Sequence, residues 1–216
     1  MIQYFNLYMC LKLFNGYIFI IEGGSVLASL MIHQIVGEEY CKRNGISSSF
    51  SFLMGNLMPD LINDKKATHY SARCVNGTYT NSIKNKVDLQ AFCEDKSLDS
   101  NFNKGMFLHL ITDQVFFYHY LLNNPKYREI ENEDQLWIHA KLYRDYYRNN
   151  KYLMDKYTDA KLYYLPSAAK QTRDDIDQME RLSNEDIDRI IDMCAGVDLE
   201  KAYETITQMT RDLLET

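Results

Sequence analysis

The sequence predicts an all-α fold, a bundle of several helices around a cluster of histidine and aspartate side chains. The 216 residues include only nine glycines and three prolines, too few for the many turns of a β-rich protein of this length. Apolar residues recur at helical spacing in several long segments. With 46% hydrophobic and 25% charged residues, the chain also has enough apolar side chains for a globular core.

The composition argues against several classes of protein. The formal net charge is −6 and there is no long basic run, so binding to nucleic acid is not expected. The five cysteines are odd in number, widely spaced and without a Cys-x-x-Cys pair. This pattern is typical neither of a disulfide framework nor of a zinc ribbon, and it predicts reduced thiols and a cytoplasmic location.

Residues 1–26 form a leader that allows more than one interpretation. Its apolar part is interrupted by Asn6, Lys12 and Asn15, so it is a poor membrane span. If residues 1–28 act as a signal peptide, the protein is exported instead. Alternatively, Glu22-Gly23-Gly24 is what a purine-rich ribosome-binding sequence encodes, and translation would then start near Val26 or Leu27. We expect residues 27–165 to form a metal-binding helical domain and residues 166–216 a helical layer packed on it.

The first predicted helices lie in the region before residue 60. Residues 27–43 are amphipathic, and Gly45 follows as a left-handed cap. Serines at 47–49 offer an N-cap for a second helix over 50–58. Pro59 should end this helix, because a residue before proline avoids helical angles.

The middle of the chain is predicted to hold a long loop and a central helix. Residues 61–100 are polar and loop-rich, with one helix near 86–93. The central helix covers 101–123 and is followed by Pro125. Further helices are expected at 134–149, in part of 151–165, and at 170–182, 184–195 and 198–215, with Ser183 and Asp198 as N-caps and Gly196 as a C-cap.

The central predicted helix carries His109 and Asp113 within an apolar stretch from 105 to 119. Four residues make about one helical turn, so both side chains leave the same face. An unpaired carboxylate buried there would cost several kcal/mol, and a divalent cation would offset that cost. A simple hydrogen bond between His109 and Asp113 in the core is the alternative interpretation.

The metal hypothesis therefore depends on further ligands upstream. His33 lies on the apolar side of the first helix, where it could equally be a core histidine. Asp60 follows a proline, and His69 lies in the polar loop. The predicted ligand set, in chain order, is His33, Asp60, His69, His109 and Asp113.

This ordered set resembles the zinc-dependent phospholipase C family, in the short form of many bacterial hydrolase-like proteins. The similarity covers about residues 27–125. It is carried by His33, by Phe52-Leu53-Met54-Gly55-Asn56-Leu57-Met58-Pro59-Asp60, by Thr68-His69-Tyr70 and by Gly105-Met106-Phe107-Leu108-His109-Leu110-Ile111-Thr112-Asp113.

The resemblance implies a phospholipase C/P1 nuclease-like fold with two Zn²⁺ ions, or iron or manganese in their place. Asp60, His69, His109 and Asp113 would hold the first ion. His33 would hold the second, with Asp113 bridging the two. Asp60 would also orient or deprotonate the attacking water.

Departures from the family concern a third metal. The family's processed N-terminus is itself a ligand, and residues 1–26 stand in its way here. His119 would be the next family ligand, but it joins the site only if the helix ends or bends before it. The family's His-x-x-x-Glu pair is missing, because Tyr143 follows His139 by four residues. Asp145 is the only substitute, and His139 is expected to be structural.

The predicted function is a metal-dependent phosphoester hydrolase acting on a phospholipid or another phosphate ester, with transient contact to a membrane surface. Lys65 and Lys66 could attract phosphate or be ordinary surface lysines. The aromatic residues 116–118 could line a lipid groove or belong to the core. Two alternatives stay open: a non-catalytic domain stabilised by metal, and an HD-type phosphohydrolase, whose adjacent His-Asp pair is absent here.

Overall fold

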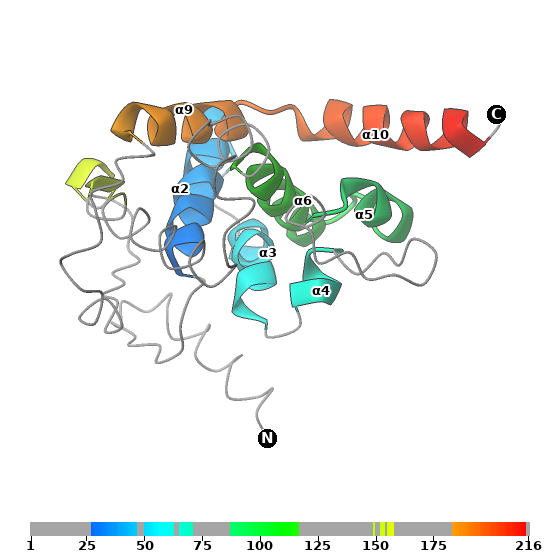
Figure 1. Cartoon of the computed structure of the whole chain (residues 1–216), viewed down its shortest axis with the longest axis horizontal. Coiled ribbons are helices and arrows are strands. Elements are labelled where there is room, and N and C mark those ends of the chain that lie inside the picture. The colour runs from blue at the N-terminus through cyan, green and yellow to red at the C-terminus, as the bar shows by residue number, and fades with distance from the viewer. Residues whose placement is uncertain are drawn as a thin grey trace, which may run out of the picture.

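The computed structural model shows a set of packed helices (Figure 1). It describes residues 27–46, 50–62, 65–70, 87–116, 149, 152–153, 155–157 and 183–214. Every regular element in this part of the chain is helical, as predicted. The helices are α2 (Leu27–Arg43), α3 (Phe50–Leu61), α4 (Lys65–Thr68), α5 (Leu89–Asp95), α6 (Asn101–Gln114), α9 (Asn184–Ala195) and α10 (Leu199–Leu214).

Helix α2 has the predicted bounds, and α3 is longer than predicted. Gly45 follows α2 with a φ of 61°, the left-handed conformation expected of a cap. Pro59 does not end α3 but lies inside it. The helix continues past it, and the N–H of Ile62 donates to the carbonyl of Met58 at 3.2 Å. The extra turn keeps Asp60 on the helix.

The segment before α6 contains two short helices. Helix α4 was not predicted, and α5 begins later than the predicted residue 86. The delay has a local cause, because the Asp88 side chain accepts a hydrogen bond from the N–H of Ala91 and so defines the start of α5.

Helix α6 covers Asn101–Gln114 of the predicted 101–123, and residues 117–123 lie outside the described residues. Ser100 caps its beginning by accepting a hydrogen bond from the N–H of Asn103. The α-helix ends at Gln114, and Val115 and Phe116 form a π turn. Such turns arise where the regular ladder of hydrogen bonds is interrupted.

Helices α3 and α6 cross in close contact at two glycines. A Cβ atom at Gly55 would lie 2.0 Å from the carbonyl oxygen of Phe102. A Cβ atom at Gly105 would lie 2.0 Å from the carbonyl oxygen of Phe52. No side chain fits at either place, so the two backbones touch directly. The crossing fixes Asp60 on α3 relative to His109 and Asp113 on α6.

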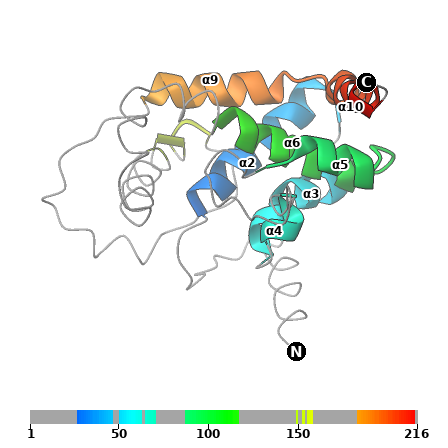
Figure 2. The same ribbon diagram turned by 45° about the vertical axis from the view of Figure 1, so that its right-hand side comes forward.

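Helices α9 and α10 follow one another along one side of the molecule (Figures 1 and 2). Both match the sequence prediction. Ser183 and Asp186 form a reciprocal capping box at the start of α9, and the Asp198 side chain accepts from the N–H of Lys201 at 3.0 Å. Helix α9 packs on α2, and α10 packs on α5 and α6.

The core lies between this pair and the other helices. Its fully buried side chains include three phenylalanines and several branched aliphatics. They include Phe52, Phe92, Phe107, Ile35, Leu108, Leu110, Ile187, Ile190, Ile191 and Leu199.

Several predictions fall outside the described residues. They are the leader 1–26 and the helices at 134–149, 151–165 and 170–182 apart from the few described positions, of which 149, 152–153 and 155–156 are helical. Within the described residues, none of the helices has the length and apolar character that crossing a membrane requires.

Candidate metal centre

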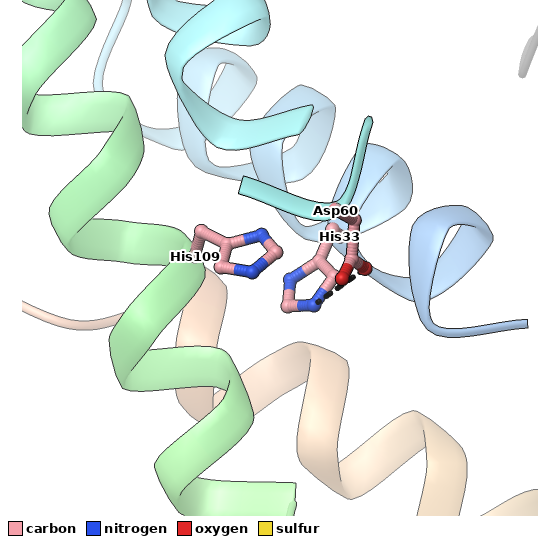
Figure 3. Close-up of side chains that lie close together, drawn as sticks. All are labelled: His33, Asp60 and His109. Carbon is pink, nitrogen blue, oxygen red and sulfur yellow. Dashed lines mark ion pairs between the residues drawn. The ribbon is translucent and has the colours of Figure 1, made fainter. Parts of the chain in front are cut away.

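All five predicted ligands meet in one buried cluster. His33 comes from α2, Asp60 from α3, His69 from the residue after α4, and His109 and Asp113 from α6. Figure 3 shows three of them, with the imidazoles of His33 and His109 and the carboxylate of Asp60 turned toward one another. Exposed fractions of the five side chains range from 0 to 10%. The five side chains therefore lie together, and their role as metal ligands stays a prediction.

The carboxylate of Asp113 faces three imidazoles. Its Oδ1 lies 3.1 Å from His33 Nε2. Its Oδ2 lies 3.2 Å from His69 Nε2 and 3.4 Å from His109 Nε2. The carboxylate therefore spans the cluster, as the resemblance implied for a bridging ligand.

Asp60 approaches the same imidazoles from α3. Its Oδ2 lies 3.8 Å from His33 Nε2, and its Oδ1 lies 3.6 Å from His69 Nε2. One turn of helix beyond the predicted end of α3 is enough to bring this carboxylate into the cluster.

The orientation of His109 is fixed by Asn56. His109 Nδ1 lies 2.8 Å from the main-chain carbonyl oxygen of Asn56. Because a carbonyl oxygen can only accept, Nδ1 carries the hydrogen and donates it. In the neutral ring, Nε2 then holds a lone pair that points into the cluster. The ring also stacks on that of His33, with centroids 3.7 Å apart.

His69 is oriented in the same sense by Thr68. The Thr68 hydroxyl donates its hydrogen to the carbonyl of Pro59 at 3.0 Å. Toward His69 Nδ1, 3.1 Å away, the hydroxyl oxygen must therefore accept, so this Nδ1 carries the hydrogen. The Nε2 lone pair of His69 also points into the cluster.

The backbone around His69 is held on both sides. Its carbonyl accepts from the N–H of Asp88 at 3.2 Å. The next residue, Tyr70, has a φ of 55°, which is unusual for a side chain of its size. Its hydroxyl donates to Asp95 at 2.7 Å, which secures that conformation.

These orientations place acceptors against acceptors. His69 Nε2 and His109 Nε2 lie only 3.1 Å apart, and Asp113 Oδ2 lies beside both. Two lone pairs and an anionic oxygen repel one another at such distances in a buried site. The arrangement needs a cation in its middle, either a metal ion or a proton on one ring.

The pKa values of the buried groups follow from the same contacts. Burial would raise the pKa of Asp113, but the imidazoles of His109 and His33 outweigh it and hold the pKa well below its usual value. Burial and the neighbouring His109 lower the pKa of His33. Burial also opposes protonation of His109, yet Asp113 raises the pKa of this ring. An ionised Asp113 beside a neutral His33 is the state in which both can bind metal.

The donor atoms have the spacing of metal ligands. In a tetrahedral zinc site, neighbouring ligand atoms lie about 3.3 Å apart. Around His69 Nε2 the corresponding distances are 3.1 Å to His109 Nε2, 3.2 Å to Asp113 Oδ2 and 3.6 Å to Asp60 Oδ1. The buried groups His69–His109–Asp113 and His33–Asp60–His109 could each hold a metal ion.

Asn56 and Thr68 hold residues of the site in place, and the sequence did not identify them in this role. Asn56 is fully buried, and its side-chain amide donates to the carbonyl of His33 on α2. Thr68 links Pro59 to His69. Each stands in a motif already singled out, and a polar residue in the middle of the apolar run 52–59 was the available signal for Asn56.

The remaining predictions for the site fall mostly outside the described residues. This applies to His119, His139, Asp145, Phe117 and Tyr118, and to the side chains of Lys65 and Lys66. Phe116 is buried in the core, which favours the core interpretation over a lipid groove at this position. The role of His119 stays a prediction.

Comparisons with models of known protein families, with curated proteins and with solved structures gave no match for this chain.

Proposed function

We propose that this chain is a metal-dependent phosphoester hydrolase with two divalent cations at the His/Asp cluster. Zn²⁺ is the favoured metal, with iron and manganese as alternatives, because imidazole and carboxylate ligands accept all three. The ordered motifs that resemble zinc-dependent phospholipase C support the reaction class. The geometry of the cluster supports the metal.

The observation that carries the proposal is the meeting of the Nε2 atoms of His69 and His109 at 3.1 Å with the Asp113 carboxylate beside them. A proton on one ring would relieve this one contact. It would not explain why a second carboxylate, Asp60, and a third imidazole, His33, are buried in the same cluster. Divalent cations account for all five side chains at once.

The residues of the chain then have defined tasks. When bound, a pair of divalent cations lowers the pKa of a water and neutralises charge on phosphate oxygens. The three histidines and two aspartates bind and hold the cations, and Asn56 and Thr68 keep two imidazoles in the ligand tautomer. The role of Asp60 as the base that deprotonates water stays a prediction from the resemblance.

The substrate class rests on the resemblance alone. A phosphate ester fits a centre of two cations, and a phospholipid is the family's own substrate type. A phospholipid substrate would bring transient contact with a membrane surface.

A second candidate is a non-catalytic domain that the metal stabilises. The burial of the ligands favours it, because no more than 10% of any ligand side chain is exposed. Low exposure leaves little access for a large substrate, and the binding energy of a structural metal contributes to folding.

The test is to purify the full chain without chelator and to measure zinc, iron and manganese per chain. The same samples are assayed with bis-p-nitrophenyl phosphate and with phosphatidylcholine vesicles. Asp192→Asn, a change at an exposed carboxylate, serves as the matched control for the ligand variant Asp60→Asn.

Three outcomes separate the candidates. Metal-dependent turnover in the full chain and in Asp192→Asn, but not in Asp60→Asn, supports the hydrolase. Tight metal without turnover, together with unfolding on chelation, supports the structural role. A folded chain that neither holds metal nor responds to chelation contradicts both.

A further inference from the structure

Asp60 and Asp113 are placed in a similar way between the imidazoles of His33 and His69. Each carboxylate turns one oxygen toward His33 and the other toward His69. For Asp113 the distances are 3.1 Å and 3.2 Å. For Asp60 they are 3.8 Å and 3.6 Å. The resemblance predicts this bridging arrangement for Asp113 only.

The two sets differ in how many ligands they contain. On the His69 side, Asp60 Oδ1, Asp113 Oδ2 and the two imidazoles of His69 and His109 give four donor atoms. On the His33 side, the donors are His33 Nε2, Asp113 Oδ1 and Asp60 Oδ2. His109 also lies near His33 and Asp60, but its single Nε2 can serve only one ion, and we assign it to the His69 side, where it lies 3.1 Å from His69 Nε2. Four protein ligands close a zinc site, whereas three leave a coordination position for water or substrate.

The third donor on the His33 side comes from Asp60 on α3. The resemblance implies that the family uses a processed N-terminus as one of its metal ligands. Here the second oxygen of Asp60 is already turned toward His33, and α3 holds it there through the extra turn after Pro59. No free N-terminus is needed to bring the ligand number to three.

We propose that Asp60 is a second bridging carboxylate and that, with His33 and Asp113, it completes the second cation site while residues 1–26 remain attached. This inference rests on the proposed centre of two cations, and it is independent of whether the centre hydrolyses anything. The proposal makes the His69 side the site with four protein ligands. It makes the His33 side the site with three protein ligands and one coordination position left for water or substrate.

The test uses Mn²⁺ as the probe, because its electron paramagnetic resonance spectrum distinguishes isolated ions from a bridged pair. The full chain, with its N-terminus checked by mass spectrometry, is stripped of metal and titrated with Mn²⁺. We expect about two ions per chain and a spin-coupled spectrum. Asp60→Asn should bind about one ion per chain and show the hyperfine pattern of isolated Mn²⁺, whereas Asp192→Asn should match the parent chain.

Several results would overturn the inference. A coupled pair in Asp60→Asn would mean that Asp60 is not needed as a bridge. A second ion that binds only after residues 1–26 are removed would mean that the N-terminus supplies the ligand. Binding of one ion, or of two uncoupled ions, to the parent chain would also contradict the bridge. This result does not depend on whether Asp60→Asn folds. Because no assay of turnover is involved, an inactive enzyme with a coupled pair would contradict the proposed hydrolysis and leave the bridge standing.

Discussion

The α3–α6 pair and the α9–α10 pair are both packed against the core, but they differ in what they bury. Helices α9 and α10 bury apolar side chains such as Ile187, Ile190 and Leu199 and expose charged ones. Helices α3 and α6 bury apolar side chains together with Asn56, His109 and Asp113.

The two pairs are therefore stabilised in different ways. The hydrophobic effect is enough to explain why α9 and α10 pack on the core. The α3–α6 pair buries groups that would destabilise a plain core. Substitutions at the α3–α6 crossing should therefore affect metal binding. Substitutions in α9 and α10 should affect only the stability of the fold.

Asp113→Asn should have the largest effect, loss of both cations. The amide has the same shape but lacks the charge that faces three imidazoles within 3.4 Å. Metal per chain after equilibrium dialysis measures it, with Asp192→Asn as the control. Unchanged metal content in Asp113→Asn would show that the ligand set is wrong.

Ile190→Ala should destabilise the fold without changing the metal content of the folded protein. Ile190 is fully buried on α9, and its truncation should cost about 2–5 kcal/mol in free energy of unfolding. Urea denaturation measures this, and Met209→Ala, at a position 60% exposed, should cost far less. If metal per folded chain fell in Ile190→Ala, the two pairs would not be separable.

Gly105→Ala should affect both properties. Its methyl group would meet the Phe52 carbonyl oxygen at 2.0 Å and push α6 away from α3. We expect a loss of about 1–3 kcal/mol and weaker metal binding. Gly45→Ala is the matched control, because its Cβ meets nothing within 4 Å and only the positive φ is strained. Equal effects on metal binding would contradict a role for the crossing.

Thr68→Val should weaken metal binding by about 10–100-fold, because the hydroxyl that fixes the tautomer of His69 is lost. Thr68→Ser keeps the hydroxyl and should restore the affinity. Nitrogen-15 spectra of the imidazoles should show a mixture of His69 tautomers in Thr68→Val only. Equal affinity in the two variants would mean that Thr68 acts through packing.

Arg43→Gln should have the smallest effect. Arg43 at the end of α2 pairs with Asp192 on α9 at 2.8 Å, and both side chains are substantially exposed. Exposed ion pairs contribute less than about 1 kcal/mol. Thermal unfolding at low and high salt measures it. A larger loss, or any loss of metal, would show that α9 helps to hold the centre.

The sequence predicted what local patterns determine. Apolar spacing and capping residues gave α2, α9 and α10 within a residue or two, and the motif order pointed to five side chains that lie together in the structure. Two details differ from the prediction. Pro59 lies inside α3, where it was expected to end the helix, and α6 changes from α-helical to π-helical hydrogen bonding at Val115.

The supporting contacts were beyond the reach of the sequence. That Asn56 would hold both the His33 carbonyl and the His109 ring depends on how three helices meet. The same applies to Asp60, whose two oxygens face imidazoles from different segments. Such relations follow from the arrangement of helices in space, which no pattern along the chain encodes.

The contact between His33 and Asp113 joins residues 80 positions apart. Contacts of such long range form late, because a large loop must be closed before they can stabilise anything. The five side chains of the cluster therefore cannot come together until α6 has been synthesised and has docked on α2. If the cluster binds cations as proposed, their uptake would follow this docking, and a shortage of cations would leave an incompletely stabilised chain exposed to proteases.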